Sequence, residues 1–322
     1  DRSLSLSVSA GDYSDREAIQ QVIAAAQEAG VDPDWARQLI DAAERQQSIL
    51  DAISRPAEKT KAWYEYRKIF LTDRRIREGV TFWGVHADAL QTVAARTGVP
   101  AELMVAIIGV ETYYGRITGS YRVIDALATL AFDYPRRSTF FTGELEQFLL
   151  LAWESGKDAL ALKGSYAGAM GFGQFIPSSY RAYAVDFDGD GVRDIWANKT
   201  DAIGSVANYF AEHDWRGTEG VVERVTLGDE TSELRALINS GLKPNVTVGE
   251  WRTMGVQVGP EQDDSRLATL MRREQESGNE YWLGYDDFYV ITRYNHSRLY
   301  AMAVYQLSQA IRKRRESTLD LT

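Results

Sequence analysis

Residues 107–116 read IIGVETYYGR, a stretch in which one acid ends an apolar run that starts at Val105. The run predicts a helix in the core, and charged side chains are rarely buried there unless they are paired or protonated. An apolar wall favours a protonated carboxyl, which is the state that a general acid requires. Glu111 is therefore a candidate catalytic acid. The alternative is a structural carboxylate that accepts hydrogen bonds from a neighbouring loop.

The composition is that of an ordinary globular protein, with 44% hydrophobic and 25% charged residues in a chain of 322. No apolar run approaches the roughly 18–20 residues of a membrane span. A net charge of −10 argues against non-specific nucleic-acid binding, since phosphate backbones are held by positive surfaces. The one basic run, residues 312–315, is expected to be a solvated last helical turn, with a polyanion or membrane contact as the alternative.

Several kinds of site are excluded by what the chain lacks. There are no cysteines, which rules out disulfides, thiol catalysis and zinc–thiolate sites. The three histidines, His86, His213 and His296, form no HExxH pattern, and there is no phosphate-binding glycine loop. No GxSxG elbow supports a serine hydrolase.

Most of the chain shows helical periodicity. Helices are expected at 15–29, from Pro33, at 84–97, at 100–112, twice between 123 and 155, near 200–213 and from 297, with a linker at 54–61. Glycines at 164, 168, 171 and 173 predict an irregular, closely approached backbone. Residues 215–285 instead suggest short strands at 221–227 and 246–248, and 289–292 is also β-prone. The fold class is therefore mainly α (α+β) with a small β-containing domain.

Residues 186–194, DFDGDGVRD, match the start of an EF-hand calcium loop. Oxygen ligands are expected at every second position, and a glycine at position six permits the sharp turn. Ala197 stands where the loop would supply its last glutamate, so a later acid could close the site. The expected ligands are Asp186, Asp188, Asp190, the Val192 carbonyl, Asp194 and Asp201, with an acidic turn that binds no ion as the alternative.

Five ordered motifs closely resemble the lytic murein transglycosylase B family (glycoside hydrolase family 103). They are IIGVETYYGR, DALATLAFDYPRR (125–137), LKGSYAGAMGFGQFIPSSY (162–180), DAIGSVANYF (201–210) and ITRYNHS (291–297). The calcium loop lies between the third and fourth motifs, as it does in that family. The resemblance runs from about Ala62 to the last helix and is weakest over 215–280.

The resemblance implies a lysozyme-like helical core with a flanking α domain and a small β domain. The expected division is an α domain at 1–100, a catalytic core at 101–214 and 286–322 with the calcium loop, and a β domain at 215–285. It implies a periplasmic enzyme of Gram-negative cell-wall turnover, in a soluble or trimmed form without the lipid-anchoring cysteine. Glycan strands and muropeptides are the expected partners, with cell-wall synthesis proteins and the outer membrane as further candidates. The protein is expected to be a monomer that binds structural calcium and no organic cofactor.

The family's functional residues carry over by motif. Glu111 matches the single catalytic acid/base. The residues that match the sugar groove are Ser165, Gln174, Tyr209, Tyr294, Asn295, Tyr300 and Tyr66, and Arg136 and Arg137 match a pair that contacts peptide stems or acidic groups. The Tyr-Tyr pair after Thr112 departs from the Arg-Trp-like pair of some members, which puts subsite details in question.

The implied reaction cuts the β-1,4 bond between N-acetylmuramic acid and N-acetylglucosamine and leaves a 1,6-anhydro sugar, which makes the enzyme a lyase. Ordinary glycosidases use two carboxylates. Here no second acid accompanies Glu111 in its motif, so one carboxyl is expected to act first as acid and then as base. A water-using muramidase and a non-catalytic peptidoglycan-binding protein are the alternatives.

Overall fold

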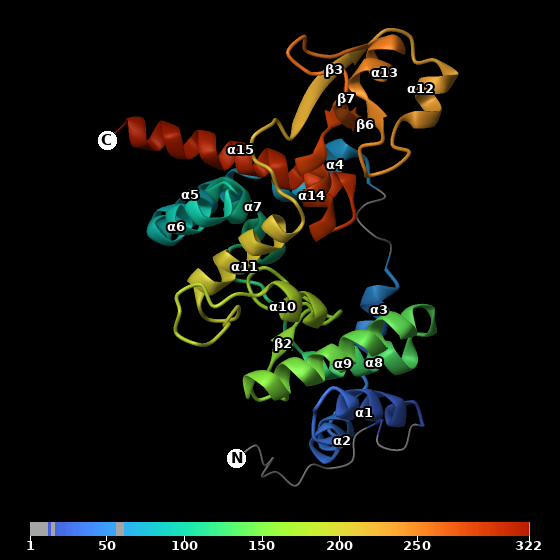
Figure 1. The fold of residues 1–322 in the computed structure, drawn as a ribbon, viewed down its shortest axis with the longest axis vertical. Helices are drawn as coiled ribbons and strands as arrows, with labels where there is room; N and C mark the ends of the chain where they lie inside the picture. The colour runs from blue at the N-terminus through green and yellow to red at the C-terminus, as the bar shows by residue number, and fades with distance from the viewer. Residues whose placement is uncertain (1–11, 14–16, 56–60, 322) are drawn as a thin grey trace. The chain divides into compact units, whose positions relative to one another are not determined.

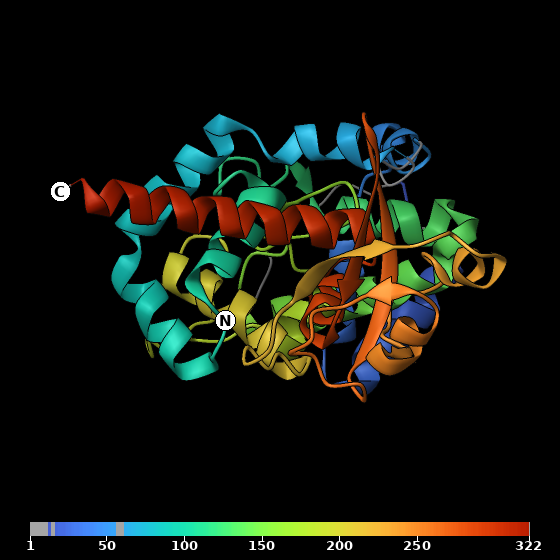
Figure 2. The same ribbon diagram turned by 90° about the horizontal axis from the view of Figure 1, so that it is seen from above.

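The computed structural model describes residues 12–13, 17–55 and 61–321 and contains two compact units. The first unit comprises residues 1–56 and 111–205, and the second comprises 57–110 and 206–322. The division falls inside two helices, α7 (Ala101–Thr112) and α11 (Lys199–Glu212). Figures 1 and 2 show the elements of each unit from two directions.

The first unit is helical. Its elements, apart from the first turns of α11, are α1 (Ala18–Glu28), α2 (Pro33–Asp41), α3 (Gln47–Ile53), β1 (Tyr121–Arg122), α8 (Val123–Asp133), η2 (Pro135–Arg137), α9 (Ser138–Ser155), β2 (Lys163–Gly164) and α10 (Pro177–Tyr183). Helices α8 and α9 form its centre, and α1, α2, α3 and α10 pack on them (Figure 1). Every residue of α8 from Val123 to Ala131 is buried, because apolar side chains occupy all sides of this helix.

Local sequence signals explain where these helices begin and end. Asp32 accepts hydrogen bonds from the backbone N–H groups of Asp34 and Trp35, and Pro33 follows at the first helical position. Gly30 has a φ of 99°, a left-handed conformation that ends the preceding helix. These two signals explain the end of the first helix near residue 29 and the start of the next at Pro33, both of which were expected from the sequence.

The helices of the second unit range from six to 23 residues in length. They are α4 (Trp63–Phe70), α5 (Asp73–Val85), α6 (Ala87–Thr97), most of α7, the end of α11, α12 (Ser232–Leu237), α13 (Val248–Thr253), α14 (Asp286–Tyr294) and α15 (Arg298–Asp320). Helix α15, the long red helix of Figures 1 and 2, packs against α4, α5 and α14. No single helix among the described residues is long and apolar enough to cross a membrane. The pair α6 and α7 passes that test of length and composition together, with a bend of 115° between them.

The second unit also contains a five-stranded antiparallel sheet in the order β4-β6-β7-β3-β5. Its strands are β3 (Val222–Leu227), β4 (Val246–Thr247), β5 (Val256–Gln257), β6 (Leu267–Gln275) and β7 (Gly278–Gly284). The hairpin of β6 and β7 runs from Thr269 opposite Gly284 to Gln275 opposite Gly278. Trp251 of α13 is buried against this sheet and donates a hydrogen bond to the carbonyl of Ala268 at 3.1 Å. All five strands lie within residues 215–285.

The structure departs from the predicted secondary structure in two places. Residues 289–292, expected to be β-prone, belong to helix α14, so that prediction was wrong. The longest strands, β6 and β7, were not predicted at all. The expected linker at 54–61 falls largely on residues 56–60, and the expected helix at 15–29 starts on residues 15–16. Both short segments lie outside the described residues. The expected domain boundaries stay a prediction.

Candidate active site

Glu111 lies at the end of α7 and begins the second segment of the first unit, and its side chain is half-buried. The expectation of burial is therefore met only in part, because the helix ends one residue later and the chain turns there. The next residue, Thr112, is 1% exposed. Its Oγ1 donates to the carbonyl of Phe172 at 2.9 Å and accepts from the N–H of Gly115 at 3.0 Å. These bonds join the helix end that carries Glu111 to the glycine-rich segment.

The turn after Glu111 has an uncommon backbone. Tyr113 and Tyr114 have φ values of 52° and 61°, a left-handed conformation that side chains with a Cβ adopt at a cost. Gly115 follows with a φ of 91°, and a Cβ there would lie 2.0 Å from the ring of Phe172. Only glycine fits this close approach, which sets the path of the chain away from α7.

Ser165 lies just after β2, in the glycine-rich segment that includes residues 164–173. Its Oγ accepts hydrogen bonds from the N–H groups of Ala167 at 3.2 Å and Ala169 at 3.1 Å. A hydroxyl has two lone pairs and one proton. Both lone pairs are used within the segment, so the orientation of this hydroxyl is fixed and its proton can be donated to a ligand.

Gln174 has a left-handed backbone, with a φ of 56°, and a half-buried side chain. Its Nε2 donates to the carbonyls of Thr118 at 3.2 Å and Gly171 at 2.9 Å. This arrangement ties the segment to the turn that follows Glu111. With both amide protons committed, Oε1 is the atom left to accept a hydrogen bond from a ligand.

Two other buried acids of the first unit have structural partners. Asp125 is 3% exposed and forms a double hydrogen bond with Arg122, at 2.8 Å for both contacts. Glu144 is 5% exposed and accepts from the N–H and the hydroxyl of Ser178, at 3.1 and 3.0 Å. Both carboxylates hold helices in place, so neither is available as a second catalytic acid.

Arg136 and Arg137 belong to η2 and are exposed. The guanidinium of Arg137 lies over the ring of Phe140, 4.2 Å from its centroid. Stacking of this kind holds the guanidinium plane while its N–H groups stay accessible. Both residues are thus placed where they could contact an acidic group in solution.

Two of the predicted groove tyrosines meet in the second unit. The rings of Tyr209 and Tyr294 pack edge to face, with centroids 4.9 Å apart, and Phe210 stacks on Tyr294 at 5.7 Å. The hydroxyl of Tyr209 donates to the carbonyl of Arg293 at 2.6 Å. His213, which was not predicted as part of the site, stacks on Tyr209 with ring centroids 4.1 Å apart. These contacts hold the half-buried Tyr294 in one orientation.

The other three predicted groove residues of this unit differ in exposure. Asn295 ends α14 and is exposed, whereas Tyr300 is 3% exposed in the first turn of α15. Tyr66 is 5% exposed in α4, where its ring packs against Phe70 at 5.3 Å. The structure thus brings Tyr209 and Tyr294 into contact in the second unit, whereas Glu111, Ser165 and Gln174 belong to the first.

Four acids of the predicted calcium loop form a cluster in the first unit. One carboxylate oxygen each of Asp186, Asp188, Asp190 and Asp201 lies within 4.8 Å of the others. The backbone wraps them as an EF-hand loop does, with the N–H of Gly191 donating to Asp186 at 2.7 Å and the N–H of Val192 to Asp190 at 3.0 Å. The donor set is hard oxygen in a loop of the right geometry, so the residues fit Ca²⁺.

Asp201 closes the cluster from the first turn of α11. It is fully buried, and its carboxylate accepts from the N–H groups of Phe187 at 2.8 Å and Asp194 at 3.0 Å. The Asp194 carboxylate lies outside the cluster. It accepts from the N–H groups of Trp196 and Ala197 and caps the turn there. The predicted roles of Asp194 and Val192 as ligands stay predictions.

The charges in the cluster interact. A hydrogen bond from Asn198 lowers the pKa of Asp188. The N–H of Val192 acts to lower the pKa of Asp190, but desolvation and the charges of Asp188 and Asp186 outweigh it and raise that pKa. Carboxylates that repel one another in this way are stabilised by a divalent cation.

Comparison with known proteins now identifies the family. The transglycosylase SLT domain family matches residues 14–309. The chain belongs to this family. Membrane-bound lytic murein transglycosylase B of Escherichia coli strain K12 is 42% identical over 311 residues, which are 94% of this chain and 84% of that protein. These matches confirm the resemblance that the motifs indicated. They also confirm that the protein is an enzyme, a peptidoglycan lytic transglycosylase.

Two solved structures of the family are similar to this chain. The catenated lytic transglycosylase SltB1 of Pseudomonas aeruginosa is 51% identical with a TM-score of 0.90, over 94% of this chain and 100% of that one. The Escherichia coli lytic transglycosylase Slt35 in complex with calcium is 41% identical with a TM-score of 0.85, over 98% and 99%. A mainly α, lysozyme-like transglycosylase fold, as expected, is confirmed.

Sequence reasoning missed several residues that shape this candidate site. Thr112 could have been noticed only because it follows Glu111 directly. A threonine at this position does not by itself predict a hydrogen bond to Phe172. His213 lies one helical turn after Tyr209, so a stacked pair could have been proposed from their spacing. Asn198, which bonds Asp188, stands three residues before Asp201 and could have been recognised as the cap of α11.

Proposed function

We propose that this transglycosylase cleaves the β-1,4 bond between N-acetylmuramic acid and N-acetylglucosamine with Glu111 as its only catalytic carboxyl. One observation carries the proposal. The helix end that bears Glu111 is joined through Thr112 to the segment that contains Ser165 and Gln174. The acid and two polar groups suited to sugar binding are therefore parts of one rigid structure.

The proposed reaction begins with Glu111 protonated. Its proton passes to the glycosidic oxygen as the bond from that oxygen to C1 breaks. The N-acetyl group of the substrate stabilises the positive charge that develops at C1. Glu111, now a carboxylate, then takes the proton of the C6 hydroxyl while the C6 oxygen bonds to C1. The product is a 1,6-anhydro sugar, no water is consumed, and Glu111 ends protonated.

Ser165 and Gln174 support this reaction as complementary hydrogen-bonding groups. The Ser165 hydroxyl has a proton to donate, which suits a carbonyl oxygen of an N-acetyl group. The Gln174 Oε1 is an acceptor, which suits a sugar hydroxyl or an amide N–H. Holding the N-acetyl group and the C6 hydroxyl in place lowers the entropic cost of the intramolecular attack.

The aromatic residues of the second unit are proposed to bind sugar rings. Sugars stack their apolar faces on aromatic rings, and phenol hydroxyls bond their hydroxyls. Tyr294 is half-buried and fixed by its aromatic neighbours, and the exposed Asn295 follows it. The other three tyrosines, Tyr209, Tyr300 and Tyr66, are more deeply buried. We propose that they contribute through their hydroxyl groups or by supporting the residues that line the groove.

Calcium is proposed as a structural ion held by Asp186, Asp188, Asp190 and Asp201, with the Val192 carbonyl and Asp194 as further candidates. The acid cluster and its EF-hand hydrogen bonds support this assignment, as does the calcium complex of Slt35. Bound calcium would fix the loop and the first turn of α11 by neutralising the acids. It takes no part in the proposed reaction.

The proposed location is the periplasm of a Gram-negative cell, in line with the membrane-bound Escherichia coli relative. Association with the outer membrane and contacts with cell-wall synthesis proteins belong to the same proposal. The proposed substrates are glycan strands and muropeptides, with Arg136 and Arg137 contacting acidic groups of the stems. A monomer is the proposed state.

Product analysis tests the reaction. Purified peptidoglycan is digested with the protein, and the released muropeptides are weighed by mass spectrometry. The proposal expects anhydro-muropeptides, which are lighter by one water than the hydrolysed products. Products with reducing ends would show a water-using muramidase instead. Binding to peptidoglycan without any release would show a non-catalytic binding protein.

A further inference from the structure

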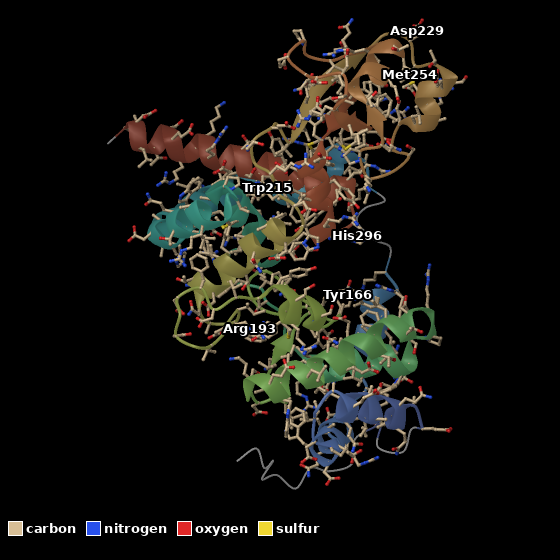
Figure 3. The ribbon with its side chains drawn as sticks, in the orientation of Figure 1. Tyr166, Arg193, Trp215, Asp229, Met254 and His296 are labelled. Carbon is tan, nitrogen blue, oxygen red and sulfur yellow. The ribbon has the colours of Figure 1, made fainter. Side chains whose placement is uncertain are left out.

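A pocket of about 400 Å³ lies entirely within the second unit. Four segments line it. They are the start of α4 with Lys61, the turn before β4 from Asn239 to Leu242, residues 272–274 of β6, and residues 296–299 at the start of α15. Figure 3 labels His296 where α14 gives way to α15. None of these residues has a role in the proposed reaction.

The pocket is rich in positive charge although the whole chain carries −10. Lys61, Arg272, Arg273 and Arg298 line it, against a single acid, Glu274. Arg272 is paired with Glu230. Arg273 and Arg298 form no ion pair with any carboxylate of the described residues. Burial and the charge of Arg293 lower the pKa of His296, so that side chain adds little charge near pH 7.

Arg273 is the most unusual of these side chains, because it is only 2% exposed. Its guanidinium donates to the backbone carbonyls of Arg272 at 3.2 Å and Arg298 at 3.1 Å, and Nε has no partner among the described residues. Desolvation and the charge of Arg298 lower the pKa of Arg273 to about 9. A buried cation without a counter-charge is costly to the fold, and an anion in the pocket would offset that cost.

Two helices add to the positive potential. Helix α4, with eight residues, begins at Trp63, and α15, with 23, begins at Arg298, and both first residues line the pocket. The first N–H groups of a helix have no acceptor within it and form the positive end of its dipole. Helix starts of this kind bind anions. The pocket therefore combines two helix N-termini with two guanidinium groups that bond backbone carbonyls and have no carboxylate partner among the described residues.

We propose that this pocket binds a carboxylate of the peptide stems of peptidoglycan, an inference that rests on the proposed function. A carboxylate is planar and matches the paired N–H groups of a guanidinium. Within the substrate, the sugars are neutral and the stems carry the carboxylates. His296 directly follows Asn295, a proposed groove residue, and neighbouring Cα atoms are about 3.8 Å apart. A stem that leaves a sugar near Asn295 would thus pass the pocket.

Titration with a free stem peptide tests the pocket without any catalysis. The probe is the tripeptide L-alanyl-γ-D-glutamyl-diaminopimelate, added to the full chain in a calorimeter. Arg273→Met and Arg298→Met are each expected to weaken binding by roughly tenfold, the scale of one charge-assisted hydrogen bond. Arg224→Met is the matched control, since Arg224 pairs with Glu280 on the sheet, lies outside the pocket and should leave the affinity unchanged.

Two further probes separate the sources of the anion. The tripeptide with its carboxylates amidated should not bind, and inorganic phosphate should bind more weakly than the free tripeptide. Equal binding of the amidated peptide, or affinities that the pocket variants leave unchanged, would overturn the proposal. Tighter binding of phosphate would assign the pocket to another anion and overturn it too. Lys61→Gln, at an exposed position, replaces Arg273→Met if that variant does not fold.

A kinetic comparison shows whether the pocket acts during cleavage. Arg298→Met should raise KM by roughly tenfold on stem-bearing strands and leave KM unchanged on strands whose stem carboxylates have been converted to amides. The same loss on both substrates would assign Arg298 a structural role and overturn the proposal. If the wild-type chain cleaves neither substrate, the proposed function fails, while the peptide titration still decides the pocket.

Discussion

Two regions of the first unit use carboxylates in opposite ways. The loop 186–201 gathers four acids within 4.8 Å, each close to backbone N–H groups or to other acids. The end of α7 instead presents one acid, Glu111, after an apolar helix and beside a turn of left-handed residues. Clustered carboxylates that repel one another favour a divalent cation, whereas a single carboxyl in apolar surroundings is suited to giving and taking a proton. Number and surroundings, more than residue type, separate the two roles.

The sharpest test of this contrast is Glu111→Gln. Removing the only proposed acid should lower kcat by about 10²- to 10⁴-fold, the usual contribution of general acid–base catalysis. The melting temperature should change little, because the replacement keeps the shape of a half-buried side chain. Turnover is measured by muropeptide release and stability by thermal unfolding.

Glu144→Gln is the control for this variant, as Glu144 is a buried acid of the same unit that only anchors Ser178. An amide oxygen can still accept those bonds, so activity should persist. Glu111→Gln with wild-type turnover would contradict the proposed mechanism.

Calcium removal should affect stability and leave the chemistry intact. An ion at 100 times its dissociation constant stabilises a fold by about 2.7 kcal/mol. Chelation should therefore lower the melting temperature, and Asp201→Asn should abolish that shift because Asp201 closes the cluster. Scanning calorimetry with calcium and with EDTA measures the effect.

Asp34→Asn, which alters an exposed acid of the same unit, should keep the calcium-dependent shift. An identical melting temperature of the wild-type chain in calcium and in EDTA would count against the ion.

Thr112→Val is expected to affect both activity and stability, whereas Glu111→Gln should affect mainly activity and calcium removal mainly stability. It removes the hydroxyl that bonds Phe172 and Gly115 but keeps the volume of the side chain. Loss of these buried hydrogen bonds should cost about 1–3 kcal/mol of stability. Because small displacements of a catalytic group are costly, kcat should also fall, by roughly tenfold. Unfolding in urea measures the loss of stability, and initial rates of muropeptide release measure the change in kcat.

The conservative Thr112→Ser retains the hydroxyl and should restore most of both losses. A valine variant with unchanged kcat would show that Thr112 stabilises the turn without positioning Glu111.

Ser165→Ala should give the smallest effect. The hydroxyl accepts from two N–H groups and has one proton for the substrate. Losing one neutral hydrogen bond should raise KM by about 3- to 10-fold. Steady-state kinetics on soluble glycan strands measures it.

Ser155→Ala is a close control, because the Ser155 hydroxyl also accepts from an N–H two residues later, at an exposed helix end. If both variants behave alike, the proposed role of Ser165 in sugar binding is wrong.

The helical part of the fold could be predicted because its signals are local. Helix α2 begins at a proline preceded by an aspartate, a local pattern that predicts a helix start. The alternating acids likewise predicted a loop that brings Asp186, Asp188 and Asp190 together. The sheet was harder. Strand β6 carries two arginines and a glutamate, and β7 begins with polar residues, so hydrophobic alternation is weak although a short turn joins the two strands at Gln275 and Gly278. Residues 289–292 have β-forming side chains but lie in a helix, where tertiary packing overrides their propensity.

The candidate site shows the same division. Glu111 could be singled out by its apolar neighbours, but the bond from Thr112 to Phe172 joins residues 60 positions apart and has no local signal. The cationic pocket was missed for the same reason, since Lys61, Arg273 and Arg298 come from three distant segments. Conversely, the expected burial of Glu111 was too strong. The end of its helix at Thr112 agrees with the predicted range 100–112, but an apolar run does not show which side chains of the last turn remain partly exposed.

The bonds around Thr112 have a consequence for hydrogen exchange. The N–H of Gly115 and the N–H of Ile117 are both held by Thr112, through its hydroxyl and its carbonyl at 2.9 Å. Gln174 holds Thr118 from the other side. An opening that exposes one of these amides to solvent must break its neighbours' bonds as well. The turn after the proposed catalytic acid should therefore exchange its protons as one cooperative group, at a slow common rate, and not fray like an ordinary surface loop.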